Sequence, residues 1–185
     1  FLKNKSVKPF SLIDEGNFST IAEKDKLSYN HSKVTTTTID NYGKEYNLEE
    51  INLIMLDLEG GEIKALKGAE RYLNKKHNKP VIIFEIHKHY ENWDSGLNNT
   101  RIVKYLKSFG YSLFAIRDYQ GNVNMAGHPI ELIPSDNVYL EGPPHGFNML
   151  AIEDVSQLND DFVFTHNVSP KLLKHKDPNI HQPLH

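Results

Sequence analysis

Three carboxylates lie close together in the sequence, directly after a run of apolar residues. Asp57, Glu59 and Glu62 follow the apolar run 51–56. Carboxylates at such a position can accept the proton of a hydroxyl group, orient a polar ligand or hold a divalent cation through hard oxygen atoms. Gly60 lies among them and has no side chain, so the backbone there can approach a ligand closely. We therefore expect a small-molecule site at this point of the chain.

A second group of chemically active residues follows the next apolar run. Glu85 is the last but one residue of the run 81–86, and His87 and His89 come shortly after this run. In a parallel sheet, the loops that follow the strands line one edge, so this group is expected to meet the first. Glu85 or His87 would then act as a general base or anchor a hydroxyl group.

Each of these residues also has a purely structural interpretation. Asp57 and Glu59 could only cap the helix that follows them, since acidic residues are frequent at that position. Glu85 could be a solvated residue at the end of a strand. His87 and His89 have no further histidine nearby in the sequence, which argues against a zinc site. The sequence therefore predicts no metal centre.

The spacing of apolar residues predicts the elements that position these groups. The runs 51–56 and 81–86 are nearly continuous and are bounded by turn residues, which is typical of strands that are covered on both faces in the middle of a sheet. Apolar residues then recur every three to four positions over 62–73 and again over 99–109, which predicts two helices. A third strand is predicted over 111–116. This alternation indicates an α/β fold with parallel pairing.

The remaining residues carry weaker signals. Residues 117–146 are rich in Gly, Pro and Asn and are interpreted as loops around one short strand at 137–140. Residues 147–152 are expected to form a closing strand, antiparallel to the strand at 111–116. We expect one domain over residues 1–160 and a polar tail over residues 161–185.

The composition excludes several classes of protein. The 185 residues are 38% hydrophobic and 24% charged, which is ordinary for a soluble globular domain. The 21 basic and 24 acidic residues are well mixed and give a net charge of -3, so neither nucleic acid nor a membrane is an expected partner. The chain has no cysteine and no apolar run of membrane-spanning length, which is consistent with a protein of the cytoplasm.

Three segments of the chain resemble one enzyme family. They are residues 34–40 (VTTTTID), 51–68 (INLIMLDLEGGEIKALKG) and 80–87 (PVIIFEIH). Together they resemble the C-terminal half of the FkbM family of S-adenosylmethionine-dependent methyltransferases. The family pattern has a threonine-leucine-aspartate element, a strand ending in lysine-x-aspartate-valine-glutamate-glycine, a helix with leucine-lysine-glycine and a strand ending in glutamate. The matching residues are Thr38, Ile39 and Asp40; Asp57, Leu58, Glu59 and Gly60; Glu62, Leu66, Lys67 and Gly68; and Glu85, with Met55 where the family usually has lysine.

The resemblance, which spans about residues 34–152, implies a fold, a cofactor and a reaction. The fold would be a Rossmann-like methyltransferase sheet, mostly parallel with an antiparallel closing strand. The reaction would be O-methylation, with S-adenosylmethionine as cofactor, of a hydroxyl on a sugar or polyketide-like metabolite; the partner would be a small-molecule or glycan acceptor. The implied catalytic residues are Asp57, Glu85 and His87, and the implied cofactor-binding residues are Asp57, Glu59, Gly60 and Glu62.

The sequence also departs from the family at one point, and this departure leaves alternatives open. Such enzymes hold the cofactor largely through a glycine-rich turn after their first strand, but no Gly-x-Gly occurs in this chain. Either the strands that carry this turn precede Phe1, so that the fold is incomplete at the N-terminus, or the cofactor half has been lost. A non-catalytic methyltransferase-like binding module is therefore the second interpretation. A metal-dependent hydrolase that uses Asp57, Glu59, Glu85 and His87 is the third.

Overall fold

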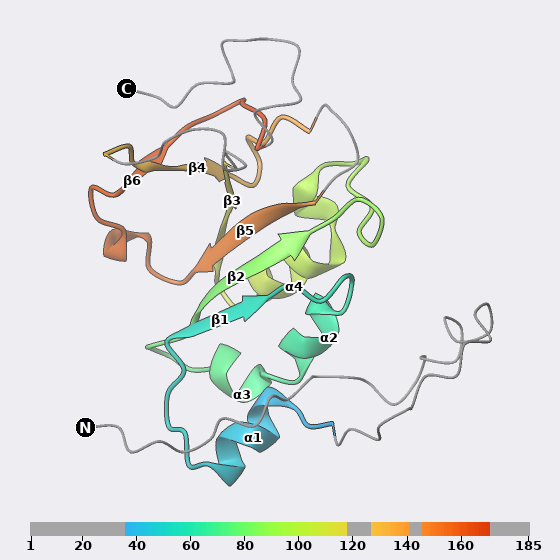
Figure 1. Cartoon of the computed structure of the whole chain (residues 1–185), viewed down its shortest axis with the longest axis vertical. Coiled ribbons are helices and arrows are strands. Elements are labelled where there is room, and N and C mark those ends of the chain that lie inside the picture. Colours follow the sequence, from blue (N-terminus) through green and yellow to red (C-terminus); the bar gives the residue numbers. More distant parts are fainter. Residues whose placement is uncertain (1–35, 118–126, 141–145, 171–185) are drawn as a thin grey trace, which may run out of the picture.

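The chain folds around a six-stranded mixed sheet with the order β1-β2-β5-β3-β4-β6 (Figure 1). The structure is a computed structural model, and it describes residues 36–117, 127–140 and 146–170. The strands are β1 (Leu53–Leu56), β2 (Val81–Ile86), β3 (Ser112–Ile116), β4 (Ile130–Pro134), β5 (Phe147–Ile152) and β6 (Phe162–Phe164). The helices are α1 (Ile39–Glu45), α2 (Glu62–Lys67), α3 (Glu70–Leu73) and α4 (Arg101–Ser108), with 3-10 turns at Leu97–Asn99 and Val155–Gln157. The α/β class is therefore confirmed.

The direction of the strands differs from the prediction of a mostly parallel sheet, which was wrong. Of the five strand pairings, only β1–β2 and β4–β6 are parallel, while β2–β5, β5–β3 and β3–β4 are antiparallel. The antiparallel pairing of β5 with β3 is confirmed. However, β5 also pairs with β2, and it thereby lies between β2 and β3. Since five of the six residues of β5 are buried, this strand is suited to the centre of the sheet.

The position of β1 also differs from the prediction of a central strand. Among the described strands, β1 forms an edge and pairs only with β2. Ile54 and Leu56 are buried, but Leu53 is 54% exposed and Met55 is 70% exposed. A continuous apolar run is typical of strands buried on both faces, but it does not say which neighbours cover them. In the described part of the chain, only one face of β1 is covered.

The main core lies between one face of the sheet and the helices. It joins strand residues such as Ile82 and Phe84, both with no exposed surface, to Leu66 and Tyr72 of the helices and to Leu106 of α4. A smaller apolar cluster lies elsewhere in the sheet and contains Phe114, Leu132, Leu150 and Ile152, against which Val155 and Leu158 pack. The alternating burial of β2 reflects the two faces, since its even-numbered residues are buried and its odd-numbered residues are half-buried.

The helix predicted over residues 62–73 is divided into α2 and α3. The N-terminal end of α1 contacts the chain at this break. The break falls between α2 and α3, where a Cβ on Gly68 would lie 3.1 Å from the Cβ of Thr38. The Asp40 N–H donates to the Gly68 carbonyl (2.8 Å), and the Arg71 N–H donates to Asp40 Oδ2 (3.1 Å). The cap of α1 is Thr38, whose hydroxyl accepts from the Asn41 N–H (3.1 Å). The threonine and aspartate of the first family element thus join α1 to α2 and α3.

The region beyond β3 contains more regular structure than predicted. β4 lies in the segment that was interpreted as loops, and the strand expected at 137–140 is reduced to a single bridge between Val138 and Val168. β6 lies in the segment that was expected to be a polar tail, and it pairs in parallel with β4. Within the described residues, no helix has both the length and the apolar character that a membrane span requires.

Candidate functional site

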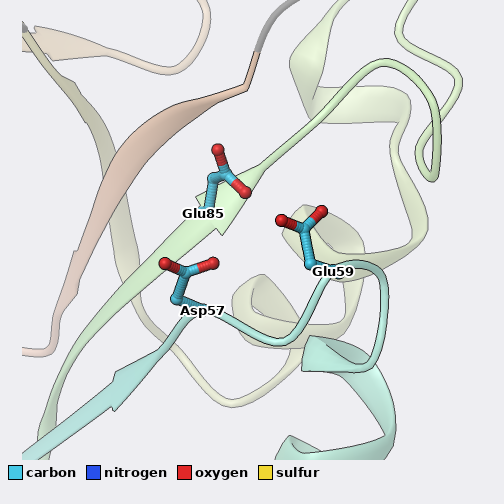
Figure 2. A group of neighbouring side chains, drawn as sticks. All are labelled: Asp57, Glu59 and Glu85. Carbon is cyan, nitrogen blue, oxygen red and sulfur yellow. The ribbon is translucent and has the colours of Figure 1, made fainter.

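The parallel pairing of β1 and β2 brings two carboxylates side by side. In the register, Leu56 pairs with Phe84, so that the next residues along the two strands are Asp57 and Glu85. One oxygen each of Asp57, Glu59 and Glu85 lies within 4.8 Å of the other two. Figure 2 shows the three carboxylates around one space, with Asp57 just after β1, Glu85 on β2 and Glu59 in the turn toward α2. The two groups of acidic residues predicted from the sequence therefore meet at one edge of the sheet.

A tight turn with an unfavourable backbone conformation holds Glu59 in this position. Glu59 has φ 51° and Gly60 has φ 96°, and the Gly61 N–H donates to the Leu58 carbonyl (3.1 Å). A left-handed conformation costs a residue with a side chain about 1–2 kcal/mol. Glu62, which is only 7% exposed, stabilises the turn because its Oε1 accepts a hydrogen bond from the Leu58 N–H (2.7 Å).

The acidic residues of this turn do not serve as helix caps. The N-cap of α2 is Gly61, and no side chain accepts a hydrogen bond there. The structural alternative for Asp57 and Glu59, capping of the following helix, is therefore not observed. Both residues are exposed, so their carboxylates are available to a ligand.

Tyr90 is a residue of this site that the sequence analysis did not identify. A Cβ on Gly60 would lie 2.7 Å from the Tyr90 ring, so the space beside Gly60 is occupied by that ring. The Tyr90 hydroxyl donates a hydrogen bond to Glu59, which raises the pKa of Tyr90. Gly60 therefore allows the close approach of a tyrosine, whereas the sequence suggested the close approach of a ligand. Tyr90 follows β2 in the same loop as His87. This proximity in the sequence was the only sign that Tyr90 could belong to the site.

The rings of His87, His89 and Tyr90 lie next to the carboxylates. The His87 centroid is 5.6 Å from that of Tyr90, and the His89 centroid is 5.0 Å from it. His87 Nδ1 accepts a hydrogen bond from the His89 N–H (2.9 Å). A neutral imidazole with an accepting Nδ1 carries its proton on Nε2, so neutral His87 can offer a hydrogen-bond donor to a ligand. A small hollow beside these rings is lined by Glu62, Ile63, Glu85, His87 and Tyr90, among others.

The environment of Glu85 favours the protonated form of its carboxyl group. Burial raises the pKa of Glu85 above its ordinary value, and the negative charges of Asp57 and Glu59 raise it further, while His87 acts in the opposite direction. A carboxyl group with a raised pKa is suited to accepting a proton from a substrate.

We expect a Glu85→Gln variant to be more stable than the wild type at pH 7, by about 1 kcal/mol, since two like charges near 5 Å repel by roughly that amount in a well-solvated site. The folded-state pKa of Glu85 is raised, so its destabilising effect develops as the pH rises through that pKa. The gain should vanish below the ordinary value of 4.5, where Glu85 is protonated in both the folded and the unfolded protein. Urea unfolding at several pH values measures this.

The matched control for this prediction is Glu49→Gln, which removes the same charge at an exposed position before β1. Its effect should stay within about 0.5 kcal/mol at all pH values. A gain for Glu85→Gln that did not depend on pH would contradict the electrostatic interpretation.

One comparison with known proteins identifies a family. A family model described as the methyltransferase FkbM domain matches residues 2–113, which is more than half of the chain. The resemblance in the sequence covered about residues 34–152, so the family match begins earlier in the chain and also ends earlier. It includes every site residue predicted from the sequence. Neither the curated proteins nor the solved structures gave a match. The chain therefore belongs to the FkbM methyltransferase family.

Proposed function

We propose that the protein is an S-adenosylmethionine-dependent O-methyltransferase that acts on a hydroxyl group of a sugar or polyketide-like metabolite. One observation supports this most: a member of a methyltransferase family gathers Asp57, Glu59 and Glu85 at the carboxyl ends of two parallel strands. Ligands of open α/β sheets bind outside these strand ends. The acceptor would be a small molecule or a glycan, and the chain without cysteine would act in the cytoplasm.

The side chains at this edge fit the chemical groups of S-adenosylmethionine. When bound, this cofactor supplies an electrophilic methyl group on a positively charged sulfur. The exposed carboxylates of Asp57 and Glu59 can attract that charge and accept hydrogen bonds from ammonium or ribose hydroxyl groups. Glu62 has a supporting role in this arrangement, because its carboxylate holds the turn that carries Glu59.

The catalytic roles follow from the environments of Glu85, His87 and Asp57. Glu85 accepts the proton of the acceptor hydroxyl, since burial and the nearby like charges raise its pKa. His87 holds the hydroxyl oxygen by donating from Nε2, because its Nδ1 is engaged by the backbone of His89. Asp57 lies nearest to β1 and orients the reacting groups, which accelerates the transfer by positioning.

The proposal is tested by calorimetry of the full chain with S-adenosylmethionine and by transfer of a labelled methyl group to a panel of sugar and polyol acceptors. We expect binding by the wild type, and a loss of turnover of about 100-fold or more for Asp57→Asn, which is typical when a positioned charged group is removed. The control Asp160→Asn makes the same change at an exposed position before β6 and should retain full turnover.

The results also separate the proposal from its alternatives. If the chain gives no heat with S-adenosylmethionine but binds a sugar, the non-catalytic binding module is the correct interpretation. If Asp57→Asn keeps full turnover, the role of Asp57 is wrong even when the reaction is right. The metal-dependent hydrolase is disfavoured by the family membership, and a thermal melt with Mg²⁺ tests whether the three carboxylates hold a cation.

A further inference from the structure

Gly146 lies next to the site, although it is far from the other site residues in sequence and outside the family match. It directly precedes β5, in which Phe147 pairs with Ile86 and Asn148 pairs with Glu85. Continuing this register places Gly146 opposite His87. Residues that face each other across two strands direct their side chains to the same face of the sheet. A side chain at position 146 would therefore project to the face that carries Glu85 and His87.

The space above Gly146 is already occupied by these two side chains. A Cβ on Gly146 would overlap Glu85 Oε1 and would lie 2.6 Å from Glu85 Cδ and 2.9 Å from His87 Cδ2. These distances are shorter than van der Waals contact, so a methyl group at position 146 and the present carboxylate position exclude each other.

The backbone gives no reason for a glycine at this position. The described glycines with positive φ are Gly60, Gly96, Gly110 and Gly127, and Gly146 is not among them. Its backbone is therefore compatible with a residue that has a side chain. A side chain is excluded at position 146 by lack of space, because the Glu85 carboxylate and the His87 ring occupy that space.

The order of the strands indicates what this space does for Glu85. Because β2 lies between β1 and β5, Glu85 has Asp57 and Glu59 on its β1 side and Gly146 on its β5 side. The Glu85 carboxylate lies between these two sides, with Oε1 over Gly146 and one oxygen within 4.8 Å of an oxygen of Asp57 and of Glu59. A methyl group at position 146 would remove this space and press the carboxylate toward Asp57 and Glu59.

We propose that Gly146 is a positioning residue of the site, and that the lack of a side chain there sets where the Glu85 carboxylate and the His87 ring lie. This inference rests on the proposed function, because it concerns the residues to which that function assigns proton transfer and hydroxyl binding. The tests use the full chain without cofactor or acceptor, so they remain informative if methyl transfer is disproved.

The first test follows the titration of the Glu85 carboxyl carbon by NMR in the wild type and in Gly146→Ala. We expect the proton affinity of Glu85 to increase about threefold in the variant, because its carboxylate moves closer to like charges. The His87 ring resonances should shift as well. The control Gln157→Ala changes an exposed residue in the turn that follows β5, and it should leave both signals unchanged. Unchanged Glu85 and His87 signals in Gly146→Ala would overturn the proposal.

The second test is a thermal-unfolding cycle with Glu85→Ala, which removes the atoms that the new methyl group would overlap. Gly146→Ala should lower Tm in the wild type, and it should lower it much less in the Glu85→Ala background, where only the contact with His87 remains. If Gly146→Ala alone does not fold, the double variant should fold. An equal decrease of Tm in both backgrounds, or a double variant that also fails to fold, would overturn the proposal.

Discussion

Replacing Glu131 with alanine is expected to lower the free energy of unfolding by about 3–5 kcal/mol, which is the usual cost of removing one member of a buried ion pair. The Glu131 side chain has no exposed surface and that of Arg117 is 1% exposed, and the Arg117 guanidinium donates to the Glu131 carboxylate. The alanine would remove the carboxylate that this buried guanidinium contacts. Urea unfolding at pH 7, followed by circular dichroism, measures the loss.

The double variant Arg117→Met with Glu131→Leu serves as the control. It removes both charges and keeps apolar volume, so its stability should lie within about 1–2 kcal/mol of the wild type. The main-chain hydrogen bond from the Arg117 N–H to the Glu131 carbonyl (3.0 Å) is retained in both variants. If Glu131→Ala lowers the free energy of unfolding no more than the double variant does, the ion pair between Arg117 and Glu131 does not stabilise the contact between β3 and β4.

Replacing Phe84 with alanine is also expected to lower the free energy of unfolding by about 3–5 kcal/mol, because a large cavity is left in a well-packed core. Phe84 has no exposed surface and lies in β2 between Leu56 of β1 and Met149 of β5. The loss is measured by the same unfolding experiment.

Met55→Ala is the matched control for Phe84, since Met55 lies on the neighbouring strand but is 70% exposed. The control should change stability by less than about 0.5 kcal/mol, as is usual for surface positions. Similar costs for Phe84→Ala and Met55→Ala would mean that the outer face of β1 is covered by protein in solution. The comparison therefore also tests the observed difference between the two faces of the strand.

The parts of the site that depend on local sequence and on one parallel pairing could be predicted. The apolar run 81–86 coincides with β2, and the run 51–56 contains β1. An acidic residue lies near the end of each run, since Asp57 directly follows the first and Glu85 is the last but one residue of the second. Two parallel strands of similar length bring their ends to the same edge of a sheet. The meeting of Asp57 with Glu85 follows from these facts alone. The same reasoning predicted α2 and α4, because their apolar residues recur at helical spacing.

The parts that depend on long-range contacts could not be predicted. The insertion of β5 between β2 and β3 leaves no local pattern in the sequence of any of the three strands. β4 was missed because the charged Glu131 interrupts its short apolar stretch, and the compensating charge, Arg117, lies far away in sequence, directly after β3. The role of Gly146 depends on its contact with Glu85, which no spacing in the sequence reports.

The central position of β5 has a consequence for how the protein acquires its structure. β2 and β3 make no pairing with each other, and each pairs with β5, which follows both of them in the chain. During synthesis, the backbone groups of both strands that later bond to β5 stay unpaired until residues 147–152 emerge from the ribosome. Folds with such distant pairings tend to fold slowly, and unpaired strand edges favour aggregation. We therefore expect the folding rate to depend more strongly on β5 than on the earlier strands.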